Sequence, residues 1–557
     1  MVRRLLNLLN REILGLHQAA FFLGFFALFS QFLALFRDRL LAHNFGAGIE
    51  LDIYYAAFRI PDLIFITVAS LVSVSIIMPL LVDHLKRGKE EARYFVRQVF
   101  SFFFIFVILV SVIVFILAPL ILPLIFPGFN GEELDSLVLL MRIMLLSPVL
   151  LGISNLFGSI SQTYQRFFLY ALSPVMYNLG IIVGILFFVP TMGVTGVAVG
   201  VVLGAFMHMV IHIPFVLQKK LMPVPTWGLD LSILRTVTFL SIPRTFTLGI
   251  THFLLIALLS LASLMAEGSI TVFNFSFNLQ SVVLSTIGVS YSLAAFPAMT
   301  KMFAEGDLKR YWNYLITSAQ HIIFWSIPIA IIFIVLRAQI IRVILGTGRF
   351  EWEATQLTAA ALALFSVSVV FQGLSLLFIR SFYAMGKTVL PLLVNLFSGI
   401  LAVVSAFVFY LVFKNFESFR YFMESLLRVE GVVGTEVLML PLGFSIGMII
   451  NGLVFIFIFE KRRKGFFKPL LLTFSQVFAS AIIGGAAAYS VLNIYSLFVE
   501  LETLLAVLLQ GVLAGLVGAL VNILVLFLLN NREIKIVLET LRQRFWKVRV
   551  SGVGHEI

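Results

Sequence analysis

The chain has 557 residues, of which 61% are hydrophobic and 12% are charged, whereas an ordinary soluble domain is about 45–50% apolar and about 25% charged. This composition excludes a soluble enzyme and a disordered or collagen-like chain, and the absence of cysteine excludes a disulfide scaffold and a cysteine-based metal site. The net charge of +12 does not by itself imply a nucleic-acid partner, and none is expected, because basic residues in a membrane protein first indicate its orientation. The composition predicts an all-α polytopic membrane protein.

The N-terminal residues 1–18 are basic and amphipathic, and the first long apolar run after them has no signal-peptide cleavage site. We therefore expect a short cytoplasmic segment followed by an uncleaved first membrane helix. Stretches of about 20 mostly apolar residues predict about fourteen membrane helices in all. They lie near residues 19–40, 52–82, 99–126, 135–161, 168–190, 192–218, 235–264, 270–298, 313–341, 356–385, 388–413, 437–459, 470–495 and 503–530.

The basic residues orient these helices. If the N-terminus is cytoplasmic, most of the 39 Lys and Arg residues fall in or beside segments on the cytoplasmic side. The loops on the opposite side hold Arg349, Lys414, Arg420 and Arg428. Because cytoplasmic loops carry the excess of positive charge, we expect both chain ends in the cytoplasm, with residues 531–557 as a basic tail.

A similar phrase occurs in the middle of each half of the chain. SQTYQRFFLYALSPVMYN at 161–178 and RSFYAMGKTVLPLLVN at 380–395 each contain a Tyr, a basic residue and Pro-x-x-x-Asn. Each phrase falls at a predicted cytoplasmic turn between the fourth and fifth helices of its half. The turn residues that correspond are Pro174 with Pro391 and Asn178 with Asn395.

Matching phrases in the same orientation predict two parallel repeats. We expect two six-helix lobes, at 19–222 and 231–463, with two further helices at 470–530. Such repeats normally face each other across a central cavity and rock to give alternating access. This organisation favours a transporter.

Ionisable side chains inside predicted membrane helices are costly and commonly functional. The first half of the chain concentrates them, and the helix predicted at 270–298 adds uncharged amides. The candidates are Arg37, Asp38, Asp52, Arg59, Asp62, Arg142, Arg244, Asn278 and Gln280. Two interpretations stay open: a cationic cavity for a phosphate-bearing headgroup, which suits guanidinium groups, or arginines that reach the membrane surface together with structural ion pairs.

No cofactor is expected from the sequence. It has no Walker motif for ATP, and no His-rich or carboxylate cluster has metal-ligand spacing. It also has no catalytic constellation, so we expect a transporter and not an enzyme. The membrane potential or an ion gradient would then drive turnover.

The segment FRDRLLAHNFGAGIELDIYYAAFRIPDLIF at 36–65 resembles the MviN/MurJ family of lipid II flippases, within the multidrug/oligosaccharidyl-lipid/polysaccharide exporter superfamily. The shared phrase is an Arg-Asp pair, Phe-Gly-Ala-Gly, an Asp, and Phe-basic-x-Pro followed by Asn or Asp. Its members here are Arg37, Asp38, Phe45, Gly46, Ala47, Gly48, Asp52, Phe58, Arg59, Pro61 and Asp62. The phrases at 161–178, 346–350 and 380–391 are also similar to family segments.

The resemblance implies two lobes in a V, a groove for the lipid tail at the last two helices, and transfer of lipid-linked peptidoglycan precursor to the outer leaflet of the bacterial cytoplasmic membrane. It implies Arg37 and Asp52 as headgroup residues, with Asp38 as a supporting partner and Arg59 nearby. Expected partners are the polyprenyl-pyrophosphate-linked substrate, membrane lipids and cell-wall synthesis proteins. The hinge positions would include Gly46, Gly48 and Pro61.

The sequence departs from the family phrase where the family carries further charges. It has Ser30-Gln31, Phe65-Ile66 and Ala69-Ser70-Leu71 where Ser-Arg, an Arg pair and Ala-Glu-Gly are usual, and Asn278 replaces an arginine. The reduced cationic cluster leaves a first alternative, an exporter of another polyprenyl-linked glycan or an amphipathic molecule. A second alternative is a non-transporting membrane scaffold for cell-wall enzymes.

Overall fold

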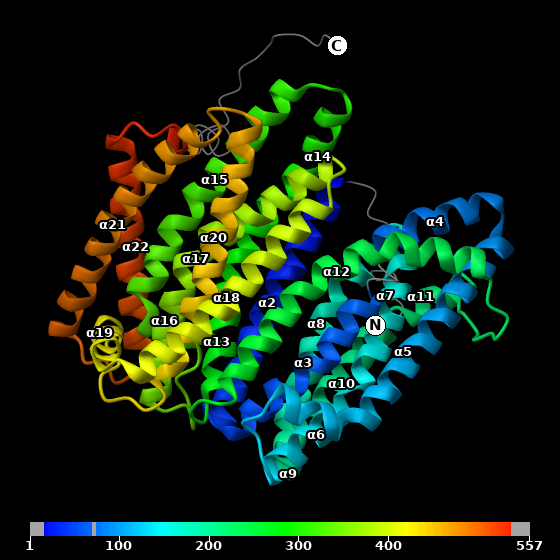
Figure 1. Cartoon of the computed structure of the whole chain (residues 1–557), viewed down its shortest axis with the longest axis horizontal. Helices are drawn as coiled ribbons and strands as arrows, with labels where there is room; N and C mark the ends of the chain where they lie inside the picture. Colours follow the sequence, from blue (N-terminus) through cyan, green and yellow to red (C-terminus); the bar gives the residue numbers. More distant parts are fainter. Residues whose placement is uncertain (1–15, 70–73, 536–557) are drawn as a thin grey trace. The chain divides into compact units, whose positions relative to one another are not determined.

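The computed structural model describes residues 16–69 and 74–535. Every regular element in these two stretches is a helix, and they contain no strand (Figure 1). The predicted all-α class is therefore confirmed. The predicted N-terminal segment, apart from residues 16–18, and the tail beyond residue 535 lie outside the described residues.

Eleven helical segments among the described residues are long and apolar enough to cross a membrane, and each coincides with one predicted span. They are Lys89–Ile125, Glu132–Thr163, Phe167–Met192, Val194–Gln218, Ser269–Ala304, Leu308–Val335, Trp352–Ala384, Val389–Asn415, Thr435–Arg462, Phe467–Phe498 and Leu504–Leu528. The other three predicted spans fall on α2 (Leu16–Phe45), α3 (Ile49–Ala69) with α4 (Val74–Arg87), and α12 (Leu231–Ala262). The total of fourteen stays a prediction.

Several of these spans contain two helices or a short irregular turn. Turns of π-helix at Gly184–Phe188 and Leu284–Val289 interrupt two spans, and a 3-10 turn at Thr435–Leu438 precedes another. The remaining helices are α5 (Lys89–Ile125), α6 (Glu132–Met144), α7 (Leu146–Thr163), α8 (Phe167–Val183), α9 (Val189–Met192), α10 (Val194–Val210), α11 (Ile213–Gln218), α13 (Ser269–Val283), α14 (Ser290–Ala304), α15 (Leu308–Val335), α16 (Arg337–Ile344), α17 (Trp352–Ala384), α18 (Val389–Asn415), α19 (Glu417–Leu427), α20 (Met439–Arg462), α21 (Phe467–Phe498) and α22 (Leu504–Leu528).

The chain divides into two compact units. The first comprises residues 1–279, 344–361 and 395–447, and the second comprises 280–343, 362–394 and 448–557. Five helices, α13, α16, α17, α18 and α20, contribute residues to both units. The division follows internal contacts and does not test the predicted lobes, whose boundaries stay a prediction.

In the first unit, α8 and the π-helical turn that follows it cross α10 at very short range, because glycines line both sides of the contact. A Cβ atom built on Gly180 would lie 2.2 Å from the Gly204 Cα, and one built on Gly184 would lie 2.4 Å from the Gly200 Cα. No side chain larger than hydrogen fits at such a contact. On the same unit α2 packs along α8, and α3 packs against α6, α7 and α12. The charged stretches of α2 and α3 therefore lie among other helices.

In the second unit, α15, α21 and α22 pack side by side (Figure 1). Part of the core of this unit is aromatic, since the rings of Phe378 and Phe382 lie 4.8–6.2 Å from those of Phe455 and Phe459. Aromatic pairs at these separations contribute about 0.5–1.5 kcal/mol beyond their buried area. The helices predicted at 470–530, α21 and α22, thus pack against α15 within this unit.

Candidate functional site

An ion pair within α2 is the centre of the candidate site. The Arg37 guanidinium donates to one Asp38 oxygen twice, from Nη2 at 2.7 Å and from Nε at 3.0 Å. The Arg37 side chain is 18% exposed and the Asp38 side chain 4%. Two hydrogen bonds that converge on one carboxylate oxygen restrict the plane of the guanidinium, so Asp38 holds Arg37 in one orientation.

Two amides from other helices complete this cluster. Asn178 of α8 accepts from Arg37 Nη1 at 3.1 Å and donates to the Ser30 hydroxyl at 3.1 Å. Asn278 of α13 donates to the second Asp38 oxygen at 3.1 Å. The structure therefore brings together three predicted site residues and Asn178, for which the sequence predicted only a turn role. The available signal was an amide inside an apolar membrane helix, which indicates a polar partner.

Helix α3 contributes two ionisable side chains, Arg59 and Asp62, and each has a different partner. The Arg59 guanidinium donates to the Asn274 side-chain oxygen of α13. Its Nε is buried, with no hydrogen-bond acceptor among the described residues. Asp62 lies 3.2 Å from His252 Nδ1 of α12. Arg59 thus keeps an unused donor, whereas Asp62 is paired with His252.

Asp52 has a different environment from the Arg37 cluster. One of its oxygens accepts from the Gly268 N–H at 2.8 Å, and the other accepts from the Thr271 N–H and hydroxyl at 2.7 and 2.6 Å. The side chain is buried. These donors lie at the start of α13, where backbone N–H groups have no partner within the helix. In this structure Asp52 therefore caps α13 from α3, and its predicted headgroup role stays a prediction.

The Phe-Gly-Ala-Gly turn joins α2 to α3 and packs against the loop before α17. Gly46 has a φ of +68°, and a Cβ atom built there would lie 2.5 Å from the Arg349 carbonyl oxygen. The Arg349 N–H in turn donates to the His43 carbonyl at 3.1 Å. Gly268 meets Ala47 in the same way, with a built Cβ 2.3 Å from its carbonyl oxygen. Three chain segments are thus interlocked at positions that require glycine.

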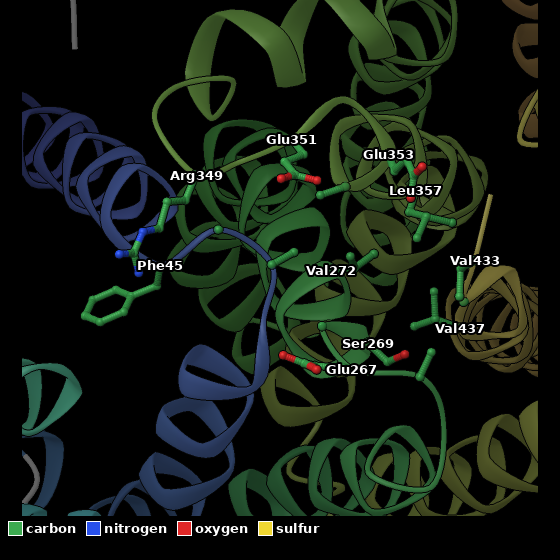
Figure 2. Close-up of a pocket in the computed structure, with 16 residues that line it drawn as sticks. Phe45, Glu267, Ser269, Val272, Arg349, Glu351, Glu353, Leu357, Val433 and Val437 are labelled. Carbon is green, nitrogen blue, oxygen red and sulfur yellow. The ribbon is translucent and has the colours of Figure 1, made fainter.

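A cavity of about 480 Å³ lies beside this junction. Figure 2 shows its charged lining, in which Glu267, Glu351 and Glu353 surround the space and Arg349 points toward Phe45. Three carboxylates outnumber one guanidinium here. The cavity therefore does not suit an anionic headgroup, and the Arg37 cluster is the better candidate for one.

The remaining predicted residues lie elsewhere. Gln280 belongs to the second unit, where its side-chain oxygen accepts from Gln372 at 3.2 Å. Arg244 lies in α12, and its side chain is outside the described part of the structure. Pro61 lies inside α3, Pro174 and Asn178 inside α8, and Pro391 and Asn395 inside α18, whereas Gly46 and Gly48 lie at the α2–α3 junction.

Comparison with known proteins decides the family. The sequence model of a family described as lipid II flippase MurJ matches residues 41–509. The chain belongs to the MurJ family. The resemblance seen in the α2–α3 phrase is therefore confirmed, although Arg37 and Asp38 precede the residue at which the match begins.

Relatives and solved structures agree with this assignment. The chain is 24% identical over 379 residues to the probable lipid II flippase MurJ of Buchnera aphidicola subsp. Schizaphis graminum, covering 67% of this chain and 74% of that protein. It is 27% identical over 380 residues to the probable lipid II flippase MurJ of Thermotoga maritima, covering 68% and 76%. A lipid II flippase MurJ structure in an inward closed conformation has a TM-score of 0.70 at 20% identity, covering 89% and 97%.

The fold also extends beyond the MurJ family. An inward-facing multidrug resistance MATE family transporter of the MOP superfamily gives a TM-score of 0.63 at 15% identity, covering 79% of this chain and 96% of that one. Likeness at this level of identity concerns the fold alone. The fold is therefore one that transporters share.

Proposed function

We propose that this protein moves lipid II from the inner to the outer leaflet of the bacterial cytoplasmic membrane by alternating access, and so supplies precursor for cell-wall synthesis. The proposal is supported by membership of the MurJ family over residues 41–509 and by relatives that are named lipid II flippases. Both chain ends would lie in the cytoplasm, as the distribution of basic residues predicts.

The Arg37 cluster would receive the pyrophosphate of the headgroup. Arg37 is already oriented by Asp38, so little side-chain freedom is lost when an anion binds. An incoming phosphate oxygen can replace the Asn178 oxygen on Nη1, and a second can accept from the buried Arg59 Nε. The amides of Asn178 and Asn278 would then turn toward sugar hydroxyls.

The lipid tail would remain in the bilayer while the headgroup crosses. We place it in a groove beside α21 and α22, which are packed on α15. The membrane potential or an ion gradient would drive turnover, without bound ATP or another cofactor. Adding valinomycin and nigericin to energised proteoliposomes should then slow the appearance of lipid II in the outer leaflet, and ATP should not restore it.

The observation that carries the proposal is the oriented Arg37 guanidinium in a chain of this family. The test is complementation of a bacterial strain depleted of its lipid II flippase, with outer-leaflet lipid II and growth as readouts. Wild-type protein should rescue, and Arg37→Ala should not. Arg142→Ala is the matched control, because Arg142 lies 4.6 Å over the Phe115 ring and donates to its carbonyl, away from the cluster.

A different polyprenyl-linked glycan is the second candidate cargo. It is favoured by one observation: Asp38 compensates the charge of Arg37, so the cluster attracts a pyrophosphate less strongly than a group of unpaired arginines would. Purified protein in liposomes with a panel of polyprenyl-linked lipids separates the two. Transport of another lipid in preference to lipid II would replace the first proposal with the second.

A further inference from the structure

The short helix α19 lies between two membrane-spanning helices. It begins at Glu417, two residues after α18 ends at Asn415, and the chain enters the next candidate span at Thr435. It ends at Leu427, the next residue, Arg428, has a φ of +60°, and the Val429 N–H donates back to the Glu424 carbonyl at 2.9 Å. Both ends of α19 are thus tethered to the same end of the membrane-spanning region.

One face of α19 packs back onto its own unit. The Phe419 ring stacks on Phe409 at 6.0 Å and meets Phe413 edge-on at 6.5 Å. Met423 and Leu427, one and two turns further along, are buried. This face fixes α19 against the end of α18, so the helix has a defined orientation.

A second face of α19 carries large apolar side chains that no described residue covers. Tyr421 is 68% exposed, Phe422 61% and Leu426 60%, and Phe416 just before the helix is 62% exposed. Phe422 and Leu426 are four positions apart and share this face, whereas Tyr421 lies toward the charged side, where it lines a pocket with Arg420 and Glu424. Large exposed apolar side chains on one face mark an interaction site. The charged residues Glu417, Arg420 and Glu424 lie three or four positions apart, on another side of the helix.

The exposed face continues a surface that must already contact lipid. Along α18 the apolar side chains Val404, Phe407, Val408 and Leu411 are exposed, with fractions from 40% to 50%. Because α18 is long and apolar enough to cross a membrane, we expect this row to face hydrocarbon. Phe416 and the exposed face of α19 follow it directly along the chain.

We propose that α19 lies in the membrane interface, with Phe416, Phe422 and Leu426 inserted among lipid chains and Tyr421 at the headgroup level. The occupant of this face is the lipid surface of the bilayer. An amphipathic helix with aromatic and Leu side chains on one side and charges on another is the form that interfacial helices take. Aromatic rings are also favoured at this depth. The anchor holds for any cargo.

The chain contains no cysteine, so single-site nitroxide labelling tests this directly. We would label Phe422→Cys, Leu426→Cys and Tyr421→Cys in the full chain, in liposomes of phosphatidylethanolamine and phosphatidylglycerol. Collision with oxygen, which concentrates in lipid, is compared with collision with a water-soluble nickel chelate. Phe407→Cys in α18 is the lipid reference, and Glu417→Cys on the charged side of α19 is the water reference.

Labels at Phe422 and Leu426 should resemble the one at Phe407, with several-fold more oxygen collision relative to nickel than at Glu417. Collision values equal to those at Glu417 would overturn the proposal. Low collision with both reagents would also overturn it, because it would mean that protein covers the face. If one of these two variants does not fold, the other decides between the same outcomes, and the label at Tyr421 should give an intermediate ratio.

Discussion

The substitution Gly46→Ala tests the interlocked α2–α3 junction. Gly46 has a φ of +68°, and an L-residue in this region costs about 1–2 kcal/mol. The added methyl would also lie 2.5 Å from the Arg349 carbonyl oxygen, so one of the two backbone segments must move. Together these costs are at least about 2–3 kcal/mol, or roughly 30- to 150-fold in the equilibrium between the packed and separated segments.

Two other glycines separate the strain from the steric overlap. Gly131 has a φ of +54° but open space around its built Cβ, so Gly131→Ala incurs the strain alone. Gly48 has no positive φ, and its built Cβ lies 3.5 Å from the Glu267 carboxylate, an ordinary contact. The expected order of destabilisation is Gly46→Ala, then Gly131→Ala, with Gly48→Ala close to wild type.

The local readout is modification of a cysteine at Thr347, in the loop that packs on the junction. The Thr347 hydroxyl lies 3.0 Å from His43 Nδ1, so separation of the segments exposes this position. Maleimide labelling at position 347 should be faster when Gly46→Ala is present and unchanged when Gly131→Ala or Gly48→Ala is present. If Gly46→Ala labels no faster than Gly131→Ala, the overlap with the Arg349 carbonyl is not real and the argument fails.

Further substitutions probe the polar contacts. Asp52→Asn loses the charge and one of two accepting oxygens at the start of α13, and should lower stability by about 1–3 kcal/mol; an unchanged melting temperature would contradict the cap. Asp38→Asn removes the ionic partner of Arg37 and should lower the melting temperature and the flipping rate together, whereas loss of flipping alone would indicate direct contact with cargo. Hydrogen bonds from Ser232 hold the pKa of Asp230 below its usual range. The Asp230 cap on α12 should therefore persist at the usual Asp pKa of about 3.9. The cap is lost only when the pH falls through the lowered pKa. Amide exchange in the first turn of α12 should accelerate there in wild type but not in Asp230→Asn.

Much of the fold could be predicted from the sequence because a bilayer leaves few choices. Backbone groups in hydrocarbon must be satisfied internally, so each long apolar run had to be a helix. The Phe-Gly-Ala-Gly phrase could also be placed at a helix junction, because glycine readily adopts the non-helical conformations that a junction requires. Glycines four residues apart, as in Gly180 and Gly184, carried a further signal of close helix packing.

The partners of the polar side chains could not be predicted in the same way. Asp52 lies 216 positions from Gly268, and Arg37 lies 141 positions from Asn178. Hydropathy shows that a polar side chain in a membrane helix needs a partner, but not which helix supplies it. The family resemblance places Asp52 among the headgroup residues, whereas in the structure its carboxylate caps the start of α13.

The partners of Arg37 also restrict how an anion could bind. If a pyrophosphate displaced Asp38, a carboxylate only 4% exposed would lose its cation, and breaking such a buried pair costs about 3–5 kcal/mol. Displacing Asn178 from Nη1 leaves only a neutral amide, which still has Ser30 as a hydrogen-bond partner. The less costly route keeps the Arg37–Asp38 pair and recruits the unused Arg59 Nε. Specificity for the headgroup would then depend on the amides and on Arg59 more than on the total positive charge.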